Sequence, residues 1–104
     1  MYIVTITYPK TADATFDFGY FRHTHLPAVG NAFSPFGLGY ASVLRGQESL
    51  DGGDPAYFAI SILSFASEEG ARNATKSDAG REVLADAANF TNVAPVMQFN
   101  TSVG

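Results

Sequence analysis

The pattern of apolar and polar positions predicts four β-strands, and the first of them shows the period of two that is typical of a strand. In the first segment aromatic and β-branched residues occupy every second position from Tyr2 to Tyr8. Pro9 closes this strand because proline has no amide donor for a neighbouring strand. The four predicted strands are Tyr2–Tyr8, Tyr40–Arg45, Ala56–Phe65 and Val96–Val103.

A helix is predicted between the first and second strands. Thr15 can cap it, and Asp17 falls in its first turn, where a negative charge suits the helix dipole. Pro27 should kink the helix, because its ring clashes one turn back and removes a hydrogen bond. Apolar side chains and one histidine recur at three- and four-residue spacing and form one stripe: Phe18, Phe21, His25, Ala28, Val29 and Ala32.

A second helical stretch lies between the third and fourth strands. Ser67 is followed by two glutamates, and Ser77-Asp78 repeats this start signal, so we expect two short helices joined near Lys76. The order β-α-β-β-α-β predicts an α+β, ferredoxin-like fold with an antiparallel four-stranded sheet. A chain of 104 residues, 46% of them hydrophobic, fits a single domain over residues 1–104.

The third predicted strand is apolar on both faces, although the helices of one chain can cover only one face of the sheet. One face carries Phe58, Ile60 and Ile62, and the other carries Tyr57, Ala59, Leu63 and Phe65. An uncovered apolar face of this size is unusual for a monomer. We therefore expect a homodimer that packs through its sheet faces.

Composition and charge exclude several classes of protein. The net charge is −4 and the six basic residues are scattered singly, which argues against a nucleic-acid partner. The absence of cysteine excludes disulfides, thiolate nucleophiles and iron–sulfur clusters. No apolar run is long enough to span a membrane, and the N-terminus has no features of a signal peptide. We expect a cytoplasmic protein without a membrane partner.

The only two histidines, His23 and His25, are two residues apart on the first predicted helix and therefore point about 200° apart. They cannot share a metal site, and no glycine-rich nucleotide motif is present, so we expect neither a metal nor another cofactor. His23 lies off the apolar stripe and should be solvated. His25 lies on it and is either a hydrogen-bonded core residue or a polar group facing a ligand cavity, where it could move a proton.

Two segments of the chain resemble the EthD family of dimeric α+β barrel proteins. Residues 16–27 read Phe-Asp-x-x-Tyr-Phe-x-x-x-His-Leu-Pro, and residues 85–91 read Ala-Asp-Ala-Ala-Asn-Phe-Thr before the last strand. The matches run in order over essentially the whole chain. Phe21 departs from the pattern where a second tyrosine is common, and Ala28 departs where leucine is frequent.

The resemblance implies a dimeric α+β barrel and a set of site residues. His25 would point into a cavity between helix and sheet, as an acid–base or polarising group oriented by Tyr20 or Asp86. The residues implied as catalytic are His25, Tyr20 and Asp86, and those implied as ligand-binding are Asp17, Asn89, Phe90 and Thr91.

The resemblance also implies a class of function. The protein would act on or bind a small hydrophobic metabolite of aromatic, cyclic or ether type, in a catabolic or polyketide pathway. A cofactor-free isomerase, dehydratase or monooxygenase-type accessory enzyme is one form of this function. A non-catalytic binding or carrier module is the alternative, and a haem-related oxidoreductase, with His25 as the only available axial ligand, is a third and weaker one.

Overall fold

Four antiparallel strands form one sheet in the order β2-β3-β1-β4. The computed structural model describes all of residues 1–104. The strands are β1 (Tyr2–Pro9), β2 (Leu38–Arg45), β3 (Tyr57–Phe65) and β4 (Val96–Asn100). This is the predicted ferredoxin-like arrangement, with a last strand that ends three residues earlier than Val103.

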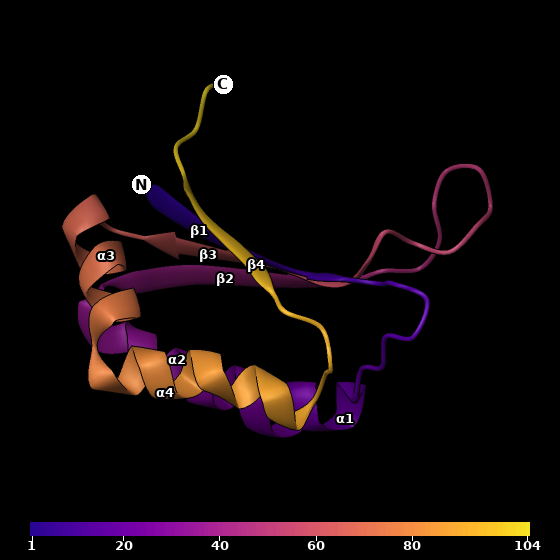
Figure 1. The fold of residues 1–104 in the computed structure, drawn as a ribbon. Coiled ribbons are helices and arrows are strands. Elements are labelled where there is room, and N and C mark those ends of the chain that lie inside the picture. The colour runs from indigo at the N-terminus through magenta and orange to yellow at the C-terminus, as the bar shows by residue number, and fades with distance from the viewer.

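The helices lie on one side of this sheet, and the other side carries none (Figure 1). Helices α2 and α4 contact one another in this layer. The helical segments are α1 (Phe18–Tyr20), η1 (Phe21–His25), α2 (Leu26–Phe33), η2 (Ser34–Phe36), α3 (Glu68–Lys76), α4 (Asp78–Ala85) and η3 (Asp86–Asn89). None of them is long and apolar enough to cross a membrane.

The first helical run begins and continues differently from the prediction. Asp17, not Thr15, is the N-cap, because its side chain accepts a hydrogen bond from the amide of Tyr20 at 3.1 Å. The irregularity expected at Pro27 takes the form of a π-helical turn, η1, which directly precedes it. Pro27 has no N–H to give to an α-helical ladder, and the π turn shifts the pairing so that the amide of Leu26 donates to Phe21.

The core lies between the helices and one face of the sheet. Alternate side chains of β1 and β3 point into it, as the period of two predicts. Those with at most 3% exposure are Val4, Ile6, Tyr8, Ala59, Leu63 and Phe65. Phe58 is an exception, since its ring stacks on Phe16 at 5.2 Å. The pairing register of β1 with β3 shifts at Tyr8/Pro9, close to Phe58, and such a shift interrupts the alternation.

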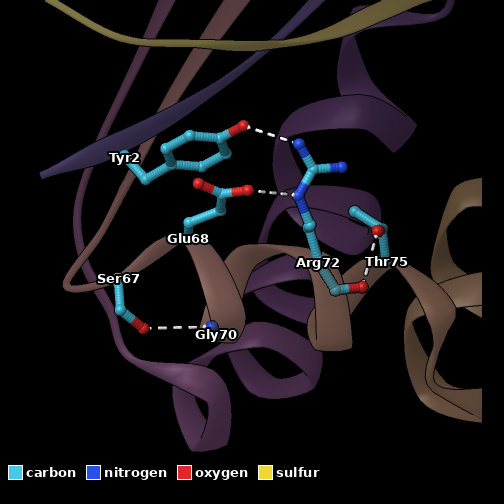
Figure 2. Close-up of polar contacts among 6 residues, drawn as sticks. All are labelled: Tyr2, Ser67, Glu68, Gly70, Arg72 and Thr75. Atoms are coloured by element: carbon cyan, nitrogen blue, oxygen red, sulfur yellow. Dashed lines mark hydrogen bonds and ion pairs between the residues drawn. The ribbon is translucent and has the colours of Figure 1, made fainter.

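Helix α3 is tied to β1 by Arg72 (Figure 2). The guanidinium donates to Glu68 and to the Tyr2 hydroxyl, both at 2.9 Å. Ser67 caps α3 through the amide of Gly70 at 3.0 Å. Ser77 separates α3 from α4, so this stretch contains the two short helices that its two start signals predict.

The face of the sheet opposite the helices carries no charged residue. The strand register places three rows of side chains there: Leu44, Ile60, Thr7 and Val96; Ser42, Ile62, Thr5 and Gln98; Tyr40, Ser64, Ile3 and Asn100. The large apolar members Tyr40, Leu44 and Val96 are 63%, 49% and 54% exposed. The face is therefore uncharged but mixed, since six of these twelve positions are apolar and six are serine, threonine, asparagine or glutamine. Phe58, which was expected on this face, packs on Phe16 instead.

Candidate functional site

The π turn η1 ends at His25 and directs this imidazole into the helical layer. His25 is 2% exposed and packs against two aromatic rings, Phe21 at 5.7 Å and Phe90 at 4.6 Å between centroids. Its Nδ1 lies 3.0 Å from Oδ2 of Asp86. A buried histidine is therefore paired with a carboxylate 61 residues away in the sequence.

Asp86 stands at the start of η3 and receives hydrogen bonds at both carboxylate oxygens. Oδ1 accepts from the Tyr20 hydroxyl at 2.7 Å and from the Asn89 side-chain amide at 2.8 Å, while Oδ2 faces His25. Burial on its own would raise the pKa of Asp86. The hydrogen bonds from Asn89, Tyr20 and His25 outweigh burial and hold this pKa below its ordinary value. The hydrogen bond from the Tyr20 hydroxyl to Asp86 also raises the pKa of the Tyr20 phenol, because an ionised phenol has no proton to donate.

The ionised Asp86 fixes the state of the His25 ring. A carboxylate without a proton can only accept, so Nδ1 carries the hydrogen and Nε2 of the neutral ring keeps a free lone pair. Every fully enclosed side-chain nitrogen or oxygen of the protein has a hydrogen-bond partner. Nε2 of His25 has no partner within the protein, so it is not fully enclosed. Nε2 is therefore the part of the ring that reaches the accessible surface, and it could accept or return a proton there.

The other motif residues connect the first helix to the segment that leads into β4. Asp17 caps α1, and its amide donates to the carbonyl of Phe90 at 2.7 Å. The Thr91 hydroxyl donates to the carbonyl of Thr15 at 2.7 Å. The four residues implied as ligand-binding line one shallow hollow of about 380 Å³, together with Thr15, Phe16 and Ala88. Phe90 is itself a core residue at 3% exposure.

The cavity between helix and sheet that the resemblance implies beside His25 is not among the hollows of the structure. None of the five hollows of the structure is lined by His25. Its partners Tyr20 and Asp86 instead face a hollow of about 450 Å³ between the first helical run and α4, which we call the Asp86 hollow. His25 is connected to this hollow through its bond to Asp86.

Three polar residues of the Asp86 hollow, Thr24, Asn31 and Glu82, were not predicted from the sequence. A sequence signal was available for Thr24 and Glu82. Each stands four residues along a helix from a predicted site residue, Thr24 from Tyr20 and Glu82 from Asp86, and this spacing was the available signal. His23 is exposed, as predicted. No group of three or more His, Asp or Glu side chains is close enough to hold a metal ion.

Known structures with the same fold identify the family. An EthD-like protein from Ralstonia eutropha JMP134 is 33% identical, with a TM-score of 0.85 over 99% of this chain and 92% of that one. The chain belongs to the EthD family. An EthD-family protein from Bacillus halodurans C-125 is 18% identical, with a TM-score of 0.78 over 99% of both chains. No family model matches the sequence, and no curated protein matches it significantly.

The EthD fold also extends to more distant structures. SnoaB, a cofactor-independent oxygenase from Streptomyces nogalater, is 12% identical with a TM-score of 0.66, over 99% of this chain and 91% of SnoaB. At this identity the likeness concerns the fold alone. Within this EthD protein, the two segments that carry the family resemblance meet in space at the bonds of Asp86 with Tyr20 and His25.

Proposed function

We propose that this EthD protein binds a small hydrophobic metabolite of aromatic, cyclic or ether type, in a catabolic or polyketide pathway, and that His25 is its acid–base or polarising group. The observation that carries the proposal is the bond between the buried His25 and the partly exposed Asp86. Hydrogen bonds hold the pKa of Asp86 below its ordinary value, and carboxylates with shifted pKa values beside a specific partner cluster at functional sites. The free Nε2 of His25 has the lone pair that such a function needs.

The division of work within the pair follows from its geometry. Asp86 stays ionised, holds the proton on Nδ1 and stabilises the imidazolium that forms when Nε2 takes a proton. Tyr20 and Asn89 orient Asp86 and act through it. The ring stacking of His25 between Phe21 and Phe90 fixes the direction of Nε2.

A non-catalytic binding or carrier module is the second candidate, and one observation favours it. His25 lines none of the hollows, so a bound molecule could rest beside Tyr20 and Asp86 without touching the imidazole. In that case His25 supports the site through its bond to Asp86.

The test is a pair of matched substitutions, His25→Gln and His23→Gln. Glutamine can still donate to Asp86 but cannot exchange a proton near neutral pH. If His25 is the acid–base group, His25→Gln abolishes the turnover of aromatic or ether-type substrates, or removes the pH dependence of the turnover that remains. The unfolding temperature and the ligand affinity of this variant should change little. Equal activity in the two variants contradicts the acid–base role and leaves the binding module.

The homodimer also belongs to the proposed function. The uncharged sheet face, with Tyr40, Leu44 and Val96 exposed, is suited to packing against the same face of a second copy. The two sheets would then close into an α+β barrel with the helices outside. The helices lie on the opposite side of the sheet from this proposed interface (Figure 1). His25 and Asp86 belong to the helical segments η1 and η3.

A further inference from the structure

Three of the six basic residues, scattered singly in the sequence, meet at one end of the sheet in the structure. Arg22 and Arg45 line a hollow of about 280 Å³ between the first helical run and β2, which we call the arginine hollow. Its other lining residues are apolar: Phe18, Phe21, Leu26, Val43, Leu44 and Ala59. Lys10 lines an adjoining hollow of about 310 Å³, which shares Phe18 and Arg45 with the first.

The two arginines carry uncompensated positive charge. The ion pairs of the chain are Lys10–Asp54, His25–Asp86 and Arg72–Glu68, so neither Arg22 nor Arg45 has a carboxylate partner. Arg72 shows the contrast, because Glu68 and Tyr2 occupy its donors (Figure 2). The guanidinium of Arg45 instead lies 3.9 Å from the centroid of Phe18. This cation–π contact orients the guanidinium while leaving its N–H groups free.

The remaining hollows differ in charge. The Asp86 hollow carries two carboxylates, Glu82 and Asp86, and no cation. The hollow under β4, about 270 Å³, has no charged residue, and the shallow hollow at the loop before α1 contains Asp17. In a chain of net charge −4, the arginine hollow and its neighbour are therefore where an anion is attracted.

We propose that the arginine hollow binds an aromatic carboxylate, with the ring against Phe18, Phe21 and Leu26 and the carboxylate on Arg45. A planar guanidinium matches a carboxylate through two parallel N–H···O bonds, and Arg22 adds a second positive charge. The apolar lining with a few convergent polar groups is typical of small-molecule sites. This rests on the proposed function for the hydrophobic class of the ligand, but it requires no role for His25.

The test compares two probes of equal shape, 2-naphthoate and its neutral amide 2-naphthamide. Binding is measured by NMR titration of the ¹⁵N-labelled full chain, with the shifts mapped onto the residues that line each hollow. We expect 2-naphthoate to shift the signals of Phe18, Val43 and Arg45, and to bind about tenfold more tightly than the amide, as one charge-assisted pair allows. The difference should shrink at high salt.

Arg45→Gln and Arg81→Gln are the matched variants, since Arg81 is an exposed arginine on α4, outside all five hollows. Arg45→Gln should remove the roughly tenfold preference for the carboxylate while leaving the affinity for the amide unchanged, and Arg81→Gln should change neither. Thermal unfolding of both variants verifies that each is folded.

Several results would overturn the inference. The inference is wrong if the two probes bind with equal affinity, or if Arg45→Gln and Arg81→Gln behave alike. It is also wrong if the NMR shifts are confined to another hollow, or if millimolar probe causes no shift at the arginine hollow. Arg45-dependent self-association without probe binding would show instead that a second copy occupies the hollow. His25 does not line the arginine hollow, so His25→Gln should leave the affinity for 2-naphthoate unchanged. Turnover therefore tests the acid–base role of His25, and 2-naphthoate affinity tests this site separately.

Discussion

The carboxylate of Asp86 bonds three side chains of the candidate site, Tyr20, His25 and Asn89, and its effect on stability can be measured. The depressed pKa means that its stabilising contribution is fully present above the ordinary value of about 3.9 and is lost as pH falls through the lower folded value. Asp86→Asn should lower the free energy of unfolding by about 1–3 kcal/mol near neutral pH, because one amide cannot accept from Tyr20, Asn89 and His25 together. This difference should narrow below pH 4.

Urea unfolding of Asp86→Asn and the native chain across the acid range checks this prediction. Asp54→Asn is the control, since the Asp54 side chain is 85% exposed and pairs with Lys10 at 3.6 Å. It should change stability by less than about 0.5 kcal/mol at every pH. A constant deficit for Asp86→Asn down to pH 2 would contradict the depressed pKa.

Tyr8 governs the opposite end of the pH range. Burial raises the pKa of this phenol to about 12. Its folded pKa lies above the unfolded value of 10, so the contribution is complete below pH 10 and is lost as pH rises toward 12. The loss should reach about 2–3 kcal/mol at most, at about 1.4 kcal/mol per pH unit. In Tyr8→Phe this alkaline loss should be absent.

Urea unfolding between pH 8 and 11, with Tyr40→Phe as the control, measures the effect of Tyr8. Tyr40 is 63% exposed on the outer sheet face. Tyr40→Phe should therefore leave the fall in unfolding free energy with rising pH the same as in the native chain. Parallel slopes for Tyr8→Phe and the native chain would show that the phenol of Tyr8 ionises without unfolding.

At the scale of elements, apolar patterning and turn residues were enough to predict four strands and two helical stretches, and their order along the chain then predicted the ferredoxin-like sheet. Local sequence signals could not predict the features that depend on tertiary contacts. The π turn before Pro27 and the register shift beside Phe58 are single-residue irregularities that periodicity cannot express. Family resemblance selected His25 and Asp86 together, but their bond depends on how η3 packs against the first helical run.

The junction of α3 and α4 gives a prediction in which one substitution has opposite effects at two places. At Gly80, a Cβ atom would lie 1.9 Å from the carbonyl oxygen of Ala74, where backbone would have to move. At Gly30, within α2, a Cβ atom would meet nothing within 4 Å. Gly80→Ala should therefore destabilise the fold by about 1–3 kcal/mol.

Gly30→Ala should stabilise it by about 0.5–1 kcal/mol, because alanine has the higher helix propensity. Midpoints of urea unfolding for both variants check the pair. The same sign for both substitutions would mean that helix propensity alone, and not the close approach of α3 to α4, governs these positions.

At the scale of the whole molecule, the surface separates by charge. The outer sheet face is uncharged, the Asp86 hollow is acidic, and the arginine hollow is basic. The sequence showed six basic residues spread singly, which argued against a nucleic-acid partner. The fold brings Lys10, Arg22 and Arg45 together because the β1–α1 loop, η1 and the end of β2 converge at one end of the sheet.

The uncharged sheet face leads to the prediction that this EthD protein is a homodimer in solution. Sedimentation or light scattering at micromolar concentration should give a mass near twice the chain mass of 11.1 kDa. Ile60→Asp would place a carboxylate on the central strand β3, on the face that we expect to be covered. An unpaired charge buried there costs about 3–5 kcal/mol, which is enough to dissociate the dimer.

Leu50→Asp is the matched control for Ile60→Asp, since it places the same charge at a fully exposed turn between β2 and β3. This variant should keep the dimer mass and the native unfolding temperature. Circular dichroism of Ile60→Asp separates a folded monomer from an unfolded chain. If the native protein has a mass of about 11 kDa at all concentrations, the uncharged sheet face does not form a dimer interface. The apolar side chains of this face would then be explained by strand propensity alone.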